Sequence, residues 1–384
     1  KLSKSNQLAK LDQSGKPYII YKSQTGFDLY TNFSKKIVLN NKNIQSFLKK
    51  KNKKKIKNTD LYIGFFGYEL LNNLIDIKLP RQKDLNFPKG IFYKPEKKIK
   101  LSNNLSYFKK DFESGSFKIN INKKSYTKIF NRFKKKIKSG ETYQIKICTK
   151  YKTKSKIDPL DFFSRLSKTN LAPEAFMIKD RNYSIVSCSP ENLITKKGSE
   201  ISTKPIAGTV KKTKNLNKSK ALNYFRKNLK ETKEHNMIVD MERNDLSRIC
   251  KIGTVRLSKQ KIVEEYKDLF HYVSLIKGKL RKNINNVDII KAMMPGGSVI
   301  GCPKINTLNL LNNQEKENRN IYTGSFGYIK FNGDMRFNII IRSILNFKNM
   351  SEISVASGVV VDSNANHEFN ENFLKAKALI DLFK

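Results

Sequence analysis

Two acidic clusters occur in a chain that is otherwise strongly basic. Glu231 and Glu234 are three residues apart in the segment ETKEHNMIVD, and Glu368 and Glu371 repeat that spacing further along the chain. On a helix, residues three apart lie on one face. Mg²⁺ prefers carboxylate and water oxygens, so two helices that each present carboxylates can hold it. A solvent-exposed acidic stripe is the ordinary alternative, and the spacing alone does not separate the two.

Short turns of glycine and small residues lie beside several strand-like segments. They are PIAGT (205–209), PGGSVIG (295–301), YTGSFGY (322–328) and ASG (356–358). The backbone amides of such turns can bind carboxylates or phosphates. Arg342, in IIIRS, is expected on a strand among apolar neighbours. A buried arginine pairs either with a carboxylate of the protein or, in a bidentate manner, with a carboxylate of a ligand.

The segment MMPGGSVIGCPK (293–304) has the glycine spacing of a phosphate-binding loop, with Gly296 and Gly301 flanking four residues. Such a loop requires a lysine directly after the second glycine, then Ser or Thr, between a strand and a helix. Here Cys302 follows Gly301, Ile305 follows Lys304, and the preceding residues have a helical pattern. The sequence therefore argues against a nucleotide site and favours a turn that lines a site for another small anion.

The elements that must position these residues alternate between strands and helices. The hydrophobic pattern predicts helices over 125–140, 158–170, 217–240, 287–295 and 366–384. It predicts strands over 16–23, 61–70, 116–122, 142–151 and 353–362, and a hairpin over 321–347 that turns at NGD. Two glycines in LYIGFFGYEL (61–70) indicate close approach of another backbone. We expect an α+β sandwich of large, mainly antiparallel sheets with outer helices, in which a region 1–120 packs intimately on a region 121–384.

Composition limits the classes of function. The 384 residues carry 77 Lys and Arg against 33 Asp and Glu, a formal net charge of +44. Nucleic-acid binding is a distant alternative, because the lysines are spread along the chain and no helix-turn-helix, zinc-finger or RNP pattern occurs. The one dense run, KKKNKKKIK (49–57), is typical of a solvated loop.

The remaining composition predicts a cytoplasmic protein without a membrane span. The four cysteines, at 148, 188, 250 and 302, form no C-x-x-C pair, which argues against structural zinc and suits a reducing compartment. No run approaches about 18 consecutive apolar residues, so we expect no transmembrane helix and no membrane partner. The first residues carry no signal-peptide pattern.

Several segments together resemble one family. They are HNMIVDMERNDLSRI (235–249), HYVS (271–274), PGGSVIGCPKI (295–305), YTGSFGY (322–328), MRFNIIIRS (335–343) and ASGVVVDSNANHEFNENFLKAKAL (356–379). In this order they resemble the chorismate-utilising enzymes, and among these the large subunits of anthranilate synthase and aminodeoxychorismate synthase. The resemblance runs from about 125 to 384 and implies an anthranilate-synthase-type sandwich.

The resemblance also implies a site for chorismate, a dicarboxylate, together with Mg²⁺. It places metal ligands at Glu234 and Glu371, with Glu368 nearby. It places catalytic residues at Glu191, as the acid that protonates the leaving 4-hydroxyl, at His271 and at Lys304. The residues that it implies for substrate binding are Ala207, Gly208, Thr209, Tyr322, Arg342, Ser357 and Gly358.

The choice of reaction depends on two positions. Gln144 stands where isochorismate and salicylate synthases of the family have a lysine that activates water, so amination by ammonia is expected. Ala207 is the anthranilate synthase form of PIxGT, since aminodeoxychorismate synthases often have lysine there. The N-terminal LLES-like segment of tryptophan-regulated anthranilate synthases is absent from YIIYKS (18–23), and MERNDLSRIC, PGGS and MRFNIIIRS resemble the aminodeoxychorismate enzymes more closely.

We therefore expect the large subunit of an aminodeoxychorismate synthase, with anthranilate synthase component I as the alternative. The chain has no G-x-C-x-G-type nucleophile segment of its own. A separate glutamine amidotransferase subunit is expected to supply the ammonia.

Overall fold

The computed structural model describes residues 4–23, 25–49, 53–78, 86–102, 105, 113–169, 172–265 and 269–384. The strands are β1 (Tyr18–Ser23), β2 (Gly26–Val38), β3 (Leu61–Phe66), β4 (Gly90–Leu101), β5 (Glu113–Ser114), β6 (Lys118–Ile119), β7 (Gln144–Lys156), β8 (Glu174–Lys179), β9 (Tyr183–Ser189), β10 (Asn192–Lys197), β11 (Glu200–Lys204), β12 (Ile206–Lys211), β13 (Arg256–Glu265), β14 (Leu269–Lys279), β15 (Gly301–Cys302), β16 (Ser325–Lys330), β17 (Met335–Asn338), β18 (Ser343–Phe347) and β19 (Met350–Val359). The helices are α1 (Lys4–Gln13), α2 (Ile44–Leu48), α3 (Tyr68–Leu74), α4 (Lys123–Lys138), α5 (Pro159–Thr169), α6 (Lys218–Lys227), α7 (Leu229–Ser247), α8 (Asn286–Met293), α9 (Lys304–Gln314) and α10 (Ala365–Ile380), with 3₁₀ turns η1 (Gly297–Val299) and η2 (Asp381–Phe383).

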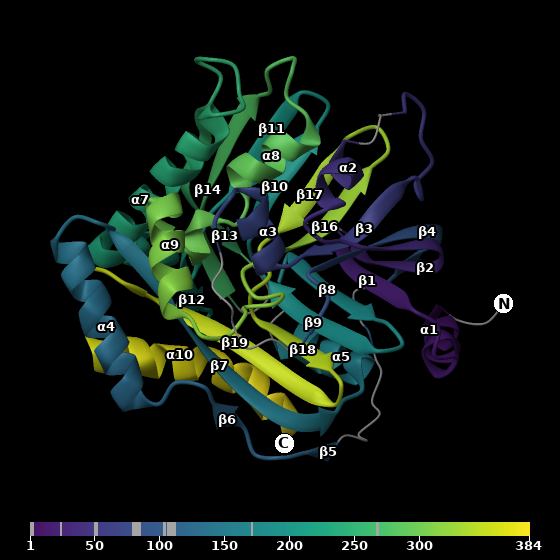
Figure 1. The fold of residues 1–384 in the computed structure, drawn as a ribbon, viewed down its shortest axis with the longest axis horizontal. Coiled ribbons are helices and arrows are strands. Elements are labelled where there is room, and N and C mark those ends of the chain that lie inside the picture. The colour runs from purple at the N-terminus through teal and green to yellow at the C-terminus, as the bar shows by residue number, and fades with distance from the viewer. Residues whose placement is uncertain are drawn as a thin grey trace.

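The strands form two antiparallel layers that share one long ribbon (Figure 1). One layer runs β2–β1–β8–β9–β18–β19–β7, and the other runs β4–β3–β16–β17–β10–β11–β14. Strands β2 and β4 pair with each other along most of their length, with a register shift between Phe33 and Lys35. This ribbon connects the layers, and the α+β sandwich expected from the sequence is confirmed.

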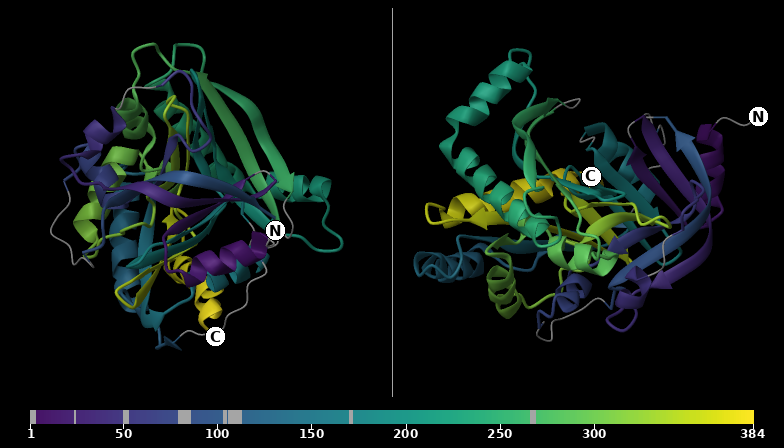
Figure 2. Two further views of the ribbon diagram at one scale, coloured as in Figure 1. Left: turned by 90° about the vertical axis from the view of Figure 1, so that its right-hand side faces the viewer. Right: turned by 90° about the horizontal axis from the view of Figure 1, so that it is seen from above.

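Helices cover the outer faces of both layers (Figure 2). An aromatic core that includes Phe65, Phe176 and Phe326 fills the space between the layers. Residues of α2, α3, α7 and α8 pack on one outer face, and residues of α1, α5 and α10 pack on the other. Burial of apolar side chains on both faces of a sheet is what fixes its register and the placement of its helices. No helix in the ranges described above is long and apolar enough to span a bilayer.

Local sequence explains the boundaries of the helices around the site. Asn122 begins α4 because its side chain accepts a hydrogen bond from the amide of Ser125. A capping box of Asn285 and Asp288 begins α8. Asn364 caps α10 through the amides of Asn366 and His367.

Most predicted elements are present, and four differ in a way that has a physical reason. The helix expected over 217–240 is two helices, because the backbone of Asn228 leaves the helical region with ψ 93°. The strand expected over 61–70 ends at Phe66, and α3 begins at Tyr68 after Gly67. The strand expected over 116–122 is reduced to the two residues of β6. Arg342 is not on a strand, because its backbone is left-handed, with φ 50°, between β17 and β18.

The glycine-rich strand β3 shows the close backbone approach that its sequence indicates. A Cβ on Gly64 would lie 1.9 Å from the carbonyl oxygen of Ile91. Gly64 also pairs with Gly327 of β16. Strand β1 pairs with β8, so the first strands share their sheets with later parts of the chain. A region boundary near residue 120 stays a prediction.

Candidate active site

A cavity of about 750 Å³ collects many of the predicted site residues. Its walls come from β7, β12, β19, η1 and α10 and from the segments that precede β10 and β18. Of the residues predicted from the sequence, Glu191, Thr209, Tyr322 and Arg342 line it. The additional polar residues that line it are Lys146, Thr169, Lys211, Ser298, Ser354, Lys375 and Asp381. A volume of this size accommodates a small organic ligand.

Glu191 is a buried carboxyl group in the cavity wall. It lies between β9 and β10, and its side chain is 5% exposed. Ser298 donates a hydrogen bond of 2.7 Å to its Oε1. Burial raises the pKa of Glu191 to about 7, although Ser298, Lys146 and Arg342 act in the opposite direction. The group can therefore hold a proton near neutral pH and release it to a ligand.

The turn after α8 supplies Ser298 and contains no phosphate-binding loop. A Cβ on Gly297 would lie 2.1 Å from Sδ of Met241, and a Cβ on Gly301, whose φ is +133°, would lie 2.0 Å from the carbonyl oxygen of Gln144. These glycines therefore let the turn pack closely against α7 and β7.

Lys304 links α7 to the end of α8, where the same turn begins. Its Nζ lies 2.5 Å from Oδ2 of Asp245 and donates a hydrogen bond of 3.0 Å to the carbonyl oxygen of Ala292. The side chain is buried, and it is not among the described residues that line the cavity. Direct contact of Lys304 with a substrate stays a prediction.

Glu234, on α7, is held by two side chains of β7. Gln144 Nε2 and Lys146 Nζ each donate a hydrogen bond of 2.9 Å to its Oε1. The Lys146 ammonium lowers the pKa of Glu234 to about 2, against the effect of burial. A Cβ on Gly358 would lie 2.7 Å from Nζ of Lys146 and 2.8 Å from Nε2 of Gln144. Gly358 thus leaves the space that this contact occupies.

The second acidic group lies on α10. Ligand atoms of His367, Glu368 and Glu371 lie within 4.8 Å of one another, and Glu234 is not part of that group. Lys375 pairs with Glu371 at 2.6 Å and donates to the carbonyl oxygen of Ala356 at 3.0 Å. The side chain of Glu231 lies outside the described residues.

The two acidic helices face a common cluster of charge. Burial opposes the charge of Lys146, yet Glu234, Glu371 and Glu191 together raise its pKa. The carboxylates of α7 and α10 therefore act on one ammonium group from different sides. Oxygen donors supplied by two helices suit Mg²⁺, which takes a few carboxylates and completes its octahedron with water and substrate oxygens. The donor chemistry therefore suits the expected ion, and one site shared by Glu234 and Glu371 stays a prediction.

His271 and Thr209 form a pair on neighbouring strands. They lie opposite each other in β14 and β12, and Thr209 Oγ1 is 2.8 Å from Nδ1 of His271. Burial, and next the Arg342 guanidinium, lower the pKa of His271 to about 4, so the ring is neutral at pH 7. Thr209 lines the cavity, and His271 holds the Thr209 side chain through this contact. Gly208 lies opposite Tyr272, and the side chain of Ala207 lies outside the described residues.

The remaining predicted binding residues differ in their access to the cavity. Tyr322 lines it, and burial raises the pKa of its phenol, which keeps the group neutral. Arg342 also lines it, and burial lowers the pKa of its guanidinium while Cys188 and Glu191 oppose this effect. Ser357 is fully buried, and its hydroxyl lies 2.9 Å from the hydroxyl of Tyr126 on α4. Ser357 is therefore positioned to fix β19 rather than to line the cavity.

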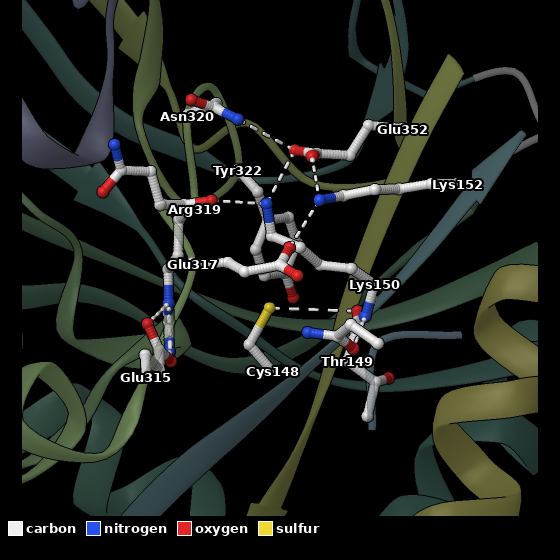
Figure 3. A network of polar contacts seen from close by, with 12 residues as sticks. Cys148, Thr149, Lys150, Lys152, Glu315, Glu317, Arg319, Asn320, Tyr322 and Glu352 are labelled. Carbon is white, nitrogen blue, oxygen red and sulfur yellow. Dashed lines mark hydrogen bonds and ion pairs between the residues drawn. The ribbon is translucent and has the colours of Figure 1, made fainter. Parts of the chain in front are cut away.

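A network of buried charges lies behind Tyr322 (Figure 3). Lys150 Nζ lies 2.8 Å from Oε1 of Glu352, and both side chains are buried. The fully buried Arg319 donates to both carboxylate oxygens of Glu315. Paired charges of this kind hold a loop in one conformation, because breaking one pair leaves a buried charge uncompensated. The network therefore fixes the segment that presents Tyr322.

The sequence reasoning missed three side chains that shape the cavity. Lys146 lies two residues after Gln144, and the two-residue period of a strand places both on one face. Lys375 lies four residues after Glu371 on one helix face. Both could have been found from these periods. Ser298 could not, because its contact with Glu191 joins segments that are distant in sequence.

Comparison with known proteins gives a consistent result. The sequence profile of the chorismate binding enzymes matches residues 11–381. The aminodeoxychorismate synthase component 1 of Bacillus subtilis is 35% identical over 267 residues, which are 69% of this chain and 57% of that protein. An anthranilate synthase component I-like protein of Synechocystis is 33% identical over 347 residues, which are 83% of this chain and 72% of that protein. The chain thus spans little more than half of the length of the Bacillus relative.

Solved structures show the same fold at lower identity. Anthranilate synthase component I from Streptococcus pneumoniae matches with a TM-score of 0.77 and 24% identity, over 95% of this chain and 92% of that one. The menaquinone-specific isochorismate synthase of Escherichia coli matches with a TM-score of 0.78 and 16% identity, over 98% of this chain and 91% of that one.

Proposed function

Because the chain belongs to the chorismate-binding enzymes, we propose that it aminates chorismate to 4-amino-4-deoxychorismate, as the large subunit of a synthase for p-aminobenzoate and folate. The observation that carries the proposal is the buried carboxyl group of Glu191, which holds a proton near neutral pH inside a cavity that also contains Arg342 and Lys146. An acid next to cationic groups is what the loss of a hydroxyl from a dianion requires.

The chemistry follows from these groups. Arg342 and nearby backbone amides bind one carboxylate of chorismate, and the neutral phenol of Tyr322 lies in the same wall. Glu191 donates its proton to the 4-hydroxyl, the C–O bond breaks, and water leaves. Ammonia forms the new C–N bond, and the proton that its nitrogen loses returns to the Glu191 carboxylate. Atoms and charge balance, because one ammonia enters and one water leaves.

Mg²⁺ bound by Glu234 and Glu371, with Glu368 nearby, would supply positive charge to the second carboxylate of the substrate. The chain's own part in this is to hold Glu234 on α7 and Glu371 on α10, where each pairs with a lysine that lines the cavity. Lys146 lowers the pKa of Glu234, which keeps this carboxylate ionised, and Lys375 pairs with Glu371.

Ammonia is favoured over water as the nucleophile because of Gln144. Its amide donates to Glu234 and has no basic atom that could remove a proton from water. Ammonia needs no such base, because its lone pair is already available. A neutral glutamine at this position therefore suits amination.

We also propose that a glutamine amidotransferase subunit supplies the ammonia. A glutaminase needs a reactive thiolate, which requires a low pKa. Burial raises the pKa of Cys148 and Cys188 to about 12 and that of Cys250 to about 11, and it also raises the pKa of Cys302. None of the four cysteines therefore has the properties of that nucleophile.

Anthranilate synthesis is the second candidate, and one residue favours it. Ala207 in PIAGT leaves no amine at the position where many aminodeoxychorismate synthases have lysine. The anthranilate synthase component 1 of Arthrobacter globiformis is 36% identical over 263 residues, which are half of that protein. Either product requires the acid and the cationic wall described above.

Product analysis decides between the two. The purified protein is incubated with chorismate, Mg²⁺ and excess ammonium near neutral pH, with and without added aminodeoxychorismate lyase, and the products are identified by mass. We expect aminodeoxychorismate without pyruvate release, and p-aminobenzoate when the lyase is present. Anthranilate together with pyruvate would establish the second candidate. Glu371→Gln is the control for turnover by a contaminating enzyme.

A further inference from the structure

Lys146 contacts the acidic group that is expected to bind the metal. Its Nζ and the Nε2 of Gln144 donate to the same oxygen, Oε1 of Glu234, at 2.9 Å each. The missing side chain of Gly358 provides the space for both donors. A strand, a glycine and a helix thus combine to bring an ammonium group onto this carboxylate.

A second ammonium group occupies the equivalent place on α10. Lys375 pairs with Glu371 at 2.6 Å. The two lysines act on each other as well, because Lys146 is one of the groups that lower the pKa of Lys375. Two ammonium groups carry together the charge of one divalent cation, and they contact the two carboxylates that are predicted to bind it.

We propose that Lys146 is a resident counter-ion that competes with the divalent cation for Glu234 and then binds a carboxylate of the substrate. A cation that approaches Glu234 meets the charge of Lys146 at the same oxygen, so one of the two must move away. Lys146 lines the cavity, so its Nζ can turn from Glu234 into the space where a dicarboxylate binds. The second step rests on the proposed function, because it takes chorismate as that dicarboxylate.

Competition of this kind makes the two ligands cooperative. A substrate carboxylate that binds Lys146 frees Glu234 for the metal, and the metal frees Lys146 for the substrate. By thermodynamic linkage each ligand then raises the affinity for the other by the same factor. Lys146 and Lys375 thus neutralise the two carboxylates in the absence of metal. When the metal binds, Lys146 is released and can bind the substrate.

The first test measures metal binding without substrate. Mg²⁺ is titrated into the protein by calorimetry, and Mn²⁺ is titrated with electron paramagnetic resonance detection of the free ion. Lys146→Met is expected to bind both ions at least about fivefold more tightly than the unmodified chain. Lys146→Arg, which keeps the positive charge, is expected to return the affinity toward that of the unmodified chain.

Lys152→Met is the matched control. Lys152 lies on the same strand and pairs with Glu317 at 2.5 Å, outside the cavity. Its loss should leave the metal affinity unchanged, and thermal melting verifies that each variant is folded. Unchanged or weaker metal binding by a folded Lys146→Met protein would overturn the proposal.

The second test measures coupling, with ammonium left out. Chorismate is titrated at saturating Mg²⁺, and its Kd is expected to rise about tenfold in Lys146→Met, as for the loss of one charged hydrogen bond. The factor by which chorismate raises the affinity for Mg²⁺ should be smaller in Lys146→Met than in the unmodified chain. An equal factor in both proteins would contradict the role of Lys146. If the proposed amination is wrong, product analysis will show it. The titration of Mg²⁺ without substrate does not depend on that reaction and tests the competition by itself.

Discussion

At the scale of single residues, the site separates the protonation states of its carboxyl groups. Burial raises the pKa of Glu191 to about 7, against the lowering effect of the hydrogen bond from Ser298. The Lys146 ammonium lowers the pKa of Glu234 to about 2. One carboxyl group is thereby suited to donate a proton, and the other is suited to bind a cation. Groups of the same type take different roles because their surroundings differ.

The rate should depend on the protonation of Glu191. Its protonated form is required, so kcat/KM should fall as the pH rises through about 7, because the pKa of the group is raised to that value. The measurement holds the concentration of unprotonated ammonia constant across pH 5.5–9. Glu191→Gln should lower kcat by about 100-fold or more, which is the size of a general-acid effect. A full rate at pH 9 for the unmodified chain would rule out Glu191 as the acid.

The residues of the site were predictable where they belong to a resembling segment. Tyr322 and Arg342 lie in such segments, the resemblance also implied Glu191 and Thr209, and the structure brings all four to one cavity. The resemblance did not indicate Lys146.

At the scale of elements, β7 serves two purposes. One face of this strand carries Ile145 and Ile147, which pack in the core formed with α4 and α9. The other carries Gln144 and Lys146, which hold Glu234. The alternation of the strand was predictable from the sequence, because its period is two.

Other local features could not be predicted from periodicity. The break at Asn228 between α6 and α7 interrupts a pattern that is continuous in the sequence. The left-handed backbone of Arg342 separates β17 from β18 within an apolar run. In both places tertiary packing overrides a local preference, and such preferences are weak beside tertiary contacts.

The network behind Tyr322 provides a test of stability at this scale. Glu315→Gln should lower the free energy of unfolding by about 3 kcal/mol or more, because it leaves the fully buried Arg319 without its carboxylate. Glu317→Gln, which removes a partly exposed partner of Lys152, should cost about 1 kcal/mol or less. Urea denaturation of both variants gives the comparison. Equal losses of unfolding free energy in the two variants would show that burial does not distinguish the Arg319–Glu315 pair from the Lys152–Glu317 pair.

At the scale of the whole molecule, the chain has a net charge of +44, and the ligand that we propose for its cavity is a dianion. Such a field raises the encounter rate with anionic ligands and is screened by salt. The charge first suggested nucleic acid. The family match and the cavity suggest a different role for the positive charge, since an excess of lysine also attracts a small dicarboxylate.

Added salt should therefore raise the KM for chorismate more than the KM for ammonia. The KM for chorismate should rise several-fold between about 50 and 500 mM KCl, with kcat little changed, because ions screen the positive field. The KM for unprotonated ammonia is the internal control, since a neutral molecule is not steered by charge. A chorismate KM that is independent of salt would show that the overall charge has no role in substrate capture.

The pairing of β7 with β19 has a consequence for synthesis of the protein on the ribosome. Ile145 of β7 pairs with Val359 of β19, so the edge of β7 that faces β19 stays unpaired until most of the chain has emerged, whereas β5 and β6 can pair with its other edge earlier. An unpaired strand with an apolar face is an aggregation hazard in a nascent chain. The sequence of β7, QIKICTKYKTKSK, places lysines at 146, 150, 152, 154 and 156 along it. Charges along a strand disfavour strand-to-strand association, and one of these lysines, Lys146, lines the cavity of the folded protein.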